Sequence, residues 1–151
     1  MFIERSIELH CEKVEPSLGK AIGAFRSDLL ALEARVGTNF PEAYREYLLW
    51  IGADFNGLLR GSDCFIAHVE ENCEALLTLF DENDLTELSY QPVVFFMHQG
   101  YFACWFDASD QACDPTVFCF NEASRELGIQ ACGTFSEWLY DEVLARSRAI
   151  Q

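Results

Sequence analysis

Hydrophobic positions recur at helical spacing in the first third of the chain. Leu29, Leu32 and Val36 lie three or four residues apart, so they mark one face of a helix. Ser27 is a residue type that caps helix N-termini, and Gly37 is placed to end the helix in a left-handed conformation. The pattern therefore predicts a helix from Ser27 to Val36.

A second helix is predicted after a short turn. Pro41 suits the first helical turn, where its missing N–H would have no partner, and Gly52 provides a stop. The apolar stripe of this helix consists of Tyr44, Tyr47, Leu48 and Ile51. The two helices have the layout of a helix–turn–helix pair, but the second carries a lone arginine flanked by glutamates. DNA recognition, which needs outward Arg, Asn or Gln side chains, is therefore not expected.

The middle of the chain begins with turn-forming residues and continues with an amphipathic pattern. Cys64 to Ala67 has the composition of an edge strand. The following stretch, Val69 to Phe80, is predicted to be a helix with its acids facing outward. The residues expected to face inward are Val69, Cys73, Leu76, Leu77 and Phe80.

The last part of the chain predicts strands followed by a helix. Three β-branched and aromatic runs joined by short connections indicate an antiparallel meander; they are Pro92–His98, Tyr101–Phe106 and Thr116–Phe120. Thr134 and Glu137 have the spacing of a capping box at the start of a final helix. With no repeat and no linker, residues 1–151 predict one α+β domain with helices packed on a mainly antiparallel sheet.

Composition narrows the classes of partner. The 151 residues are 50% hydrophobic and carry 25 acidic against 10 basic side chains, for a net charge of -15. Such a surface repels nucleic-acid phosphates and anionic membranes, so neither is expected as a partner. A basic protein partner remains open.

The acidic excess is localised. From Gly61 to Ala145 there are 16 acids and one base, whereas the first 60 residues are nearly balanced. The clustering costs stability through repulsion, which indicates either a solvated face that maintains solubility or a docking surface for a cationic partner. The candidate partner-binding residues are Glu70, Glu71, Glu74, Asp81, Glu82, Asp84, Asp107, Asp110 and Asp114.

The N-terminus and the cysteines predict a location in the cytoplasm. The first residues lack the positively charged lead of a signal peptide, and no apolar run approaches the roughly 20 residues of a membrane helix. The 7 cysteines include no C-x-x-C pair. We therefore expect reduced cysteines that pack as small apolar residues.

Catalytic and metal-binding patterns are weak. His10 and Cys11 are adjacent, which is not a ligand spacing, whereas His98 and Cys104 could face each other across a hairpin, with Cys113 or Cys119 nearby. Acidic surroundings weaken a thiol nucleophile, and no phosphate-binding loop or G-x-S-x-G elbow is present. We expect no enzyme activity, no metal and no cofactor; a metal-dependent enzyme is the third hypothesis.

Four segments in order resemble the SUKH superfamily. They are Leu32–Leu48 with its hydrophobic-Pro-x-x-Tyr step, Phe95–Phe102, Asp114–Phe118 and Thr134–Leu139, and the resemblance spans about residues 28–145. An insertion, Gly52–Phe55, precedes Asn56-Gly57 and departs from the pattern. The superfamily includes a fungal cell-wall-assembly regulator and many bacterial immunity proteins. The resemblance implies an α+β fold without catalytic residues.

The acidic surface and this resemblance lead to one main functional hypothesis. The chain is expected to be an immunity protein that binds and neutralises a cognate bacterial toxin of the nuclease or deaminase type. The alternative is a general regulatory or scaffolding module whose acidity serves solubility.

Overall fold

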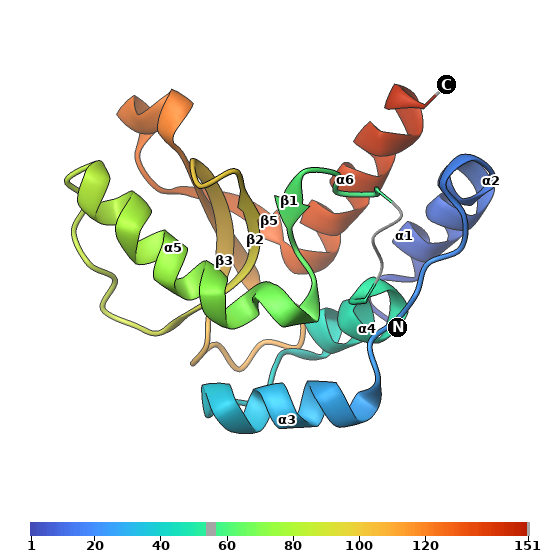
Figure 1. Ribbon diagram of the computed structural model, residues 1–151, viewed down its shortest axis with the longest axis horizontal. Helices are drawn as coiled ribbons and strands as arrows, with labels where there is room; N and C mark the ends of the chain where they lie inside the picture. Colours follow the sequence, from blue (N-terminus) through green and yellow to red (C-terminus); the bar gives the residue numbers. More distant parts are fainter. Residues whose placement is uncertain (54–56, 151) are drawn as a thin grey trace.

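A five-stranded antiparallel sheet separates two layers of helices (Figure 1). The computed structural model describes residues 1–53 and 57–150. The α-helices are α1 (Glu4–Leu9), α2 (Glu15–Leu18), α3 (Arg26–Val36), α4 (Glu42–Ile51), α5 (Val69–Glu82) and α6 (Phe135–Ala149), with a π-helical turn at His10–Val14 and 3-10 turns at Ile66–His68 and Glu122–Leu127. The strands are β1 (Ser62–Asp63), β2 (Pro92–His98), β3 (Phe102–Asp107), β4 (Thr116–Asn121) and β5 (Gln130–Thr134). The predicted α+β class is confirmed.

Strands that are neighbours in the chain are neighbours in the sheet. The order is β1-β2-β3-β4-β5, and every pair is antiparallel, so the predicted three-stranded meander is confirmed and gains a strand at each edge. The prediction of an edge strand at Cys64–Ala67 is wrong. The short edge strand is Ser62–Asp63, and a 3-10 turn begins at Ile66.

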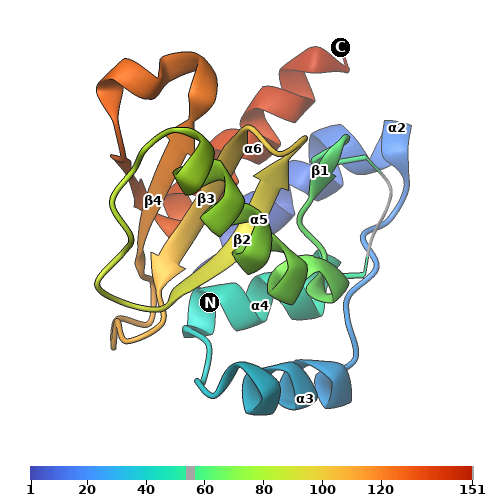
Figure 2. The ribbon, with the colours of Figure 1, turned by 60° about the vertical axis from the view of Figure 1, so that its left-hand side comes forward.

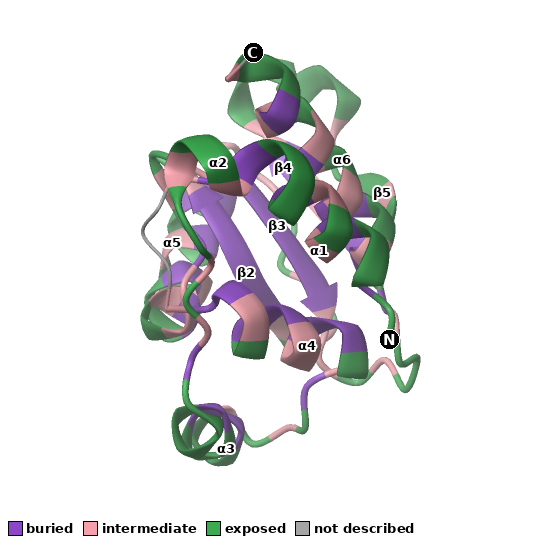
Figure 3. Ribbon diagram, turned by 90° about the vertical axis from the view of Figure 1, so that its right-hand side faces the viewer, coloured by how far each residue is buried: buried purple, intermediate pink, exposed green. Residues whose placement is uncertain are grey.

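Each face of the sheet carries its own apolar core. The larger core packs α4, α6 and the N-terminal helices against one face, and the smaller core packs α5 against the other (Figures 1 and 2). A β-bulge in β2 shifts the register with β3 between Val94 and Phe96, which changes the faces of the sheet to which the following side chains point. Phe95 and Phe96 therefore both join the larger core, while Val94 and Met97 join the smaller one. Figure 3 shows β2 and β3 buried between the layers.

The helix α5 covers the second face through a stripe that matches only part of the prediction. Val69, Leu76 and Phe80 are buried as expected. Asn72 is also buried, and its side-chain amide donates to the carbonyls of Asp63 and Val94. Leu77, which was expected to face inward, is 60% exposed, so that prediction is wrong.

A buried carboxylate joins α3 to α4. Glu33 is 4% exposed and accepts hydrogen bonds from the Phe40 amide at 2.7 Å and from Arg45 Nε and Nη2 at 2.7 and 2.6 Å. Burial raises the pKa of this carboxyl, but the bonds from Arg45 and Phe40 outweigh burial and hold the pKa below its ordinary value. The turn between the helices is therefore fixed by a charged group inside the protein.

The N-terminal helices were not predicted. Helix α1 and the π-helical turn lie against α6, and the Glu46 carboxylate of α4 accepts from the amides of Phe2 and Ile3 at 2.8 and 3.2 Å. The boundary at Ser27 was also inexact, because α3 begins at Arg26 and has no side-chain cap at its N-terminus. The expectation that all cysteines are free is wrong, because a disulfide joins Cys119 to Cys132 between β4 and β5.

The start of α6 confirms the predicted capping box. The Thr134 hydroxyl accepts from the Glu137 amide, and the Glu137 carboxylate accepts from the Thr134 amide at 2.9 Å. Within the described part of the chain, no helix combines the length and apolar character needed to cross a bilayer.

The Glu33 network predicts a pH-dependent stability. Glu33→Gln should lower the free energy of unfolding at pH 7 by about 2 kcal/mol, because it replaces charge-assisted bonds with neutral ones. A carboxyl whose folded-state pKa is depressed stabilises the fold above the unfolded-state pKa, about 4.3, and less as the pH falls through the folded-state pKa. The difference between wild type and variant should therefore shrink toward pH 3.

Urea unfolding followed by tryptophan fluorescence at pH 7 and pH 3 measures this difference. Asp28→Asn, at an exposed position in the same helix, is the control and should change stability by less than about 0.5 kcal/mol. An equal loss for both variants would contradict the assigned role of Glu33.

The capping box gives a second stability prediction. Thr134→Ala should lower the free energy of unfolding by about 1 kcal/mol, because the Glu137 amide loses its acceptor. Thr78→Ala, on the exposed face of α5, should leave stability unchanged or slightly raised because Ala favours helix. Thermal unfolding followed by circular dichroism tests both, and equal shifts would argue against the cap.

Candidate functional site

The outer face of α5 combines acids with one exposed leucine. Glu70, Glu74, Leu77 and Asp81 follow one another at helical spacing, so they form a line along the side of α5 that faces away from the sheet. Glu71 and Glu82 flank this line, and Asp84 follows the helix. We call Glu70, Glu71, Glu74, Leu77, Asp81, Glu82 and Asp84 the α5 surface.

Most acids of the α5 surface have no ion-pair partner. Glu70 pairs with Arg35 at the end of α3, with Nη2 and Oε2 3.1 Å apart. In the described part of the chain, no ion pair within 4.0 Å holds Glu71, Glu74 or Asp81. The same is true of Glu82 and Asp84. Their charges therefore repel one another and project an uncompensated negative field into solvent.

The carboxylates of the second acidic group, Asp107, Asp110 and Asp114, accept hydrogen bonds within the protein. Asp107 accepts from the amide and hydroxyl of Ser109, both at 2.7 Å, and Asp110 accepts from the Ala112 amide at 2.9 Å. Asp114 accepts from the amide and hydroxyl of Ser136 at the start of α6, at 2.9 and 2.6 Å. All three are half-buried; the Asp107 and Asp110 carboxylates shape the β3–β4 loop, and the Asp114 carboxylate holds the loop on α6.

The two acidic groups lie on either side of the C-terminal end of α3. Arg35 of α3 pairs with Glu70 of the α5 surface. The Gln91 side chain donates to the Val36 carbonyl, and the Gln91 carbonyl accepts from the Ala108 amide in the β3–β4 loop. The predicted residues therefore form two neighbouring groups. In the described part of the chain, the carboxylates of Asp107, Asp110 and Asp114 are hydrogen-bonded, whereas most carboxylates of the α5 surface have neither an ion pair nor a side-chain hydrogen bond.

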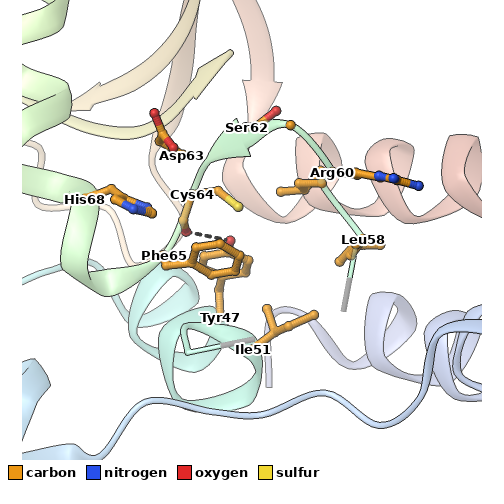
Figure 4. A pocket seen from close by; sticks show the side chains of 12 residues that line it. Tyr47, Ile51, Leu58, Arg60, Ser62, Asp63, Cys64, Phe65 and His68 are labelled. Carbon is orange, nitrogen blue, oxygen red and sulfur yellow. Dashed lines mark hydrogen bonds between the residues drawn. The ribbon is translucent and has the colours of Figure 1, made fainter. Parts of the chain in front are cut away.

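An apolar pocket of about 440 Å³ lies between α4 and the segment 57–65 (Figure 4). Tyr47, Ile51 and Leu58 line it, and the Tyr47 hydroxyl donates to the Cys64 carbonyl at 2.9 Å. Figure 4 shows the charged end of Arg60 directed away from these apolar side chains. Part of the insertion noted in the sequence, and the first residue of the predicted Asn56-Gly57 turn, lie outside the described residues.

The histidine and cysteine patterns form no catalytic arrangement in the described residues. Ser62 Oγ lies 2.8 Å from His98 Nδ1. Both residues line a surface pocket that Glu142 of α6 also lines, but no hydrogen bond joins a described carboxylate to His98. A hydrolase triad needs that bond to orient the imidazole. Cys104 is paired with Phe96 rather than with His98, and burial raises the pKa of its thiol well above the usual range.

The comparisons with known proteins place the chain in a family. A search of the curated proteins found no match. The model of the SMI1 / KNR4 family (SUKH-1) matches residues 23–141, which include α3, α4, α5 and the whole sheet. The chain therefore belongs to the SMI1 / KNR4 family (SUKH-1).

Proposed function

We propose that the protein is a non-catalytic cytoplasmic immunity protein that binds a basic bacterial toxin domain through the α5 surface and thereby blocks its active site. Family membership supports the coarser role, an immunity or regulatory protein that acts by protein–protein interaction. The single observation that supports the finer role is the row of unpaired acids around an exposed leucine on α5.

The unpaired acids are not needed to hold α5 in place. The helix is fixed from its inner side by Leu76, Leu79 and Phe80, which are at most 3% exposed. Outside, the close carboxylates only repel one another in the free protein. A cationic partner would turn this repulsion into attraction, and it would also be steered into contact at a raised association rate.

Leu77 adds the apolar element that a specific interface needs. A protein interface has an apolar centre that loses its water, surrounded by a polar rim. Leu77 lies among Glu74 and Asp81 with 60% of its surface exposed. An apolar side chain of the partner would cover it while basic groups meet the rim.

The chemistry of the partner follows from this surface. Enzymes that act on nucleic acids bind phosphates with Lys and Arg side chains, so their active-site clefts are basic. An acidic helix occupies such a cleft with charges that imitate the phosphates. The α5 surface therefore fits a toxin of the nuclease or nucleic-acid deaminase type.

The binding prediction tests the acids and the leucine of the α5 surface separately. The triple variant Glu71→Lys, Glu74→Lys, Asp81→Lys should weaken binding to an inactivated toxin domain encoded beside the protein by about 30-fold or more. Leu77→Asp should weaken it by about tenfold or more, because the apolar centre is lost. Isothermal titration calorimetry of the purified proteins gives the dissociation constants.

The matched control carries Glu4→Lys, Asp28→Lys and Asp141→Lys, all exposed and outside the α5 surface. It should bind within about threefold of wild type and protect cells that co-express the active toxin. Equal losses for both triple variants would mean that total charge, not the α5 surface, determines binding. Binding that does not weaken as the salt concentration rises would instead favour the regulatory module with an uncharged interface.

A further inference from the structure

A π-helical turn interrupts the N-terminal helix. The turn spans His10–Val14, between the helices α1 and α2 that Figure 1 labels, and the Glu15 amide donates to the His10 carbonyl five residues earlier. Such wide turns are rare, cost regular hydrogen bonding and occur often at functional sites. The extra residue changes which side chains come together on this part of the helix.

The side chains that come together are chemically distinctive. One ligand atom each of His10, Cys11 and Glu15 lie within 4.8 Å of one another. In the described part of the chain, this is the one group of three or more His, Cys, Asp or Glu side chains with that geometry. Sequence spacing did not reveal it, because the third member is five residues from the first and depends on the π turn.

The surroundings hold one member rigidly and leave the others accessible. His10 is fully buried, and its ring meets Trp50 of α4 edge-on with centroids 5.2 Å apart. Cys11 is exposed and Glu15 is half-buried, so an ion from solvent can reach both. The neighbouring Glu12 is paired with Lys13 at 2.6 Å and is not a member of the cluster.

The donor set identifies the class of ion. Imidazole nitrogen, thiolate sulfur and carboxylate oxygen are the three protein donors that bind Zn²⁺, whereas Mg²⁺ and Ca²⁺ take oxygen donors. Three protein ligands leave one position of a tetrahedral zinc site for water. Zn²⁺ bound between Cys11 and Glu15 would replace the thiol proton of Cys11.

We propose that His10, Cys11 and Glu15 form a zinc site on the N-terminal segment, beside Trp50 of α4. The site is separate from the α5 surface, since α1 and α2 pack on the opposite face of the sheet (Figures 1 and 3). Zinc binding is thus independent of the proposed toxin interface.

The experiment titrates the full chain, freed of metal and with its Cys119–Cys132 disulfide intact, with Zn²⁺ in competition with a chromogenic chelator. Wild type should bind one Zn²⁺ per chain with micromolar or tighter affinity. Cys11→Ser and Glu15→Gln should each weaken binding by about 100-fold or more, because even outer-shell changes cost about 10–100-fold. Both positions lie at least partly in solvent, so both variants should remain folded by circular dichroism.

Two variants serve as controls. Glu12→Gln removes a neighbouring acid outside the cluster, and Cys113→Ser removes an exposed thiol elsewhere; both should bind Zn²⁺ like wild type. With Co²⁺ in place of Zn²⁺, wild type should show a thiolate-to-cobalt absorption band that Cys11→Ser lacks. Binding that is absent in wild type, or unchanged in Cys11→Ser and Glu15→Gln, would overturn the proposal.

Discussion

The arrangement of α3 and α4 depends on the hydrogen bonds that the buried carboxylate of Glu33 accepts. This carboxylate accepts hydrogen bonds from the Phe40 amide and from two nitrogens of Arg45, so it fixes both the turn between α3 and α4 and the direction of α4. That direction places the Tyr44 ring among Phe95, Phe106 and Phe135 in the larger core. A helix set at another angle would withdraw Tyr44 and open a cavity that the aromatic side chains could not close.

The sheet accommodates two helical layers because β2 serves both of its faces. Strict alternation would give each face every second residue, yet the larger core receives both Phe95 and Phe96. The bulge between Val94 and Phe96 makes this possible and still returns Met97 to the α5 side. The fold therefore obtains a thick aromatic core on the α4 and α6 side without losing the contacts that hold α5.

Periodicity predicted most helices and the three central strands, and it failed where a polar residue or a partner decides the structure. On α5 a buried Asn72 occupies a core position because it bonds two carbonyls, so the true stripe does not include Leu77. The strand β5 has small and polar residues and exists through its pairing with β4. The acidic residues predicted as a site include three whose carboxylates fold a loop, a difference that depends on tertiary neighbours.

The separation of the two cores has a consequence for recognition. The Glu33 network and the aromatic cluster around Tyr44 lie on one face of the sheet, and α5 lies on the other. Because α5 is held mainly by its inner stripe, with one ion pair from Glu70 to Arg35, the charge and shape of the rest of its outer face can change with little effect on the network that sets the fold. The acids without an ion pair and Leu77 lie on this outer face, so they can vary independently of the Glu33 network.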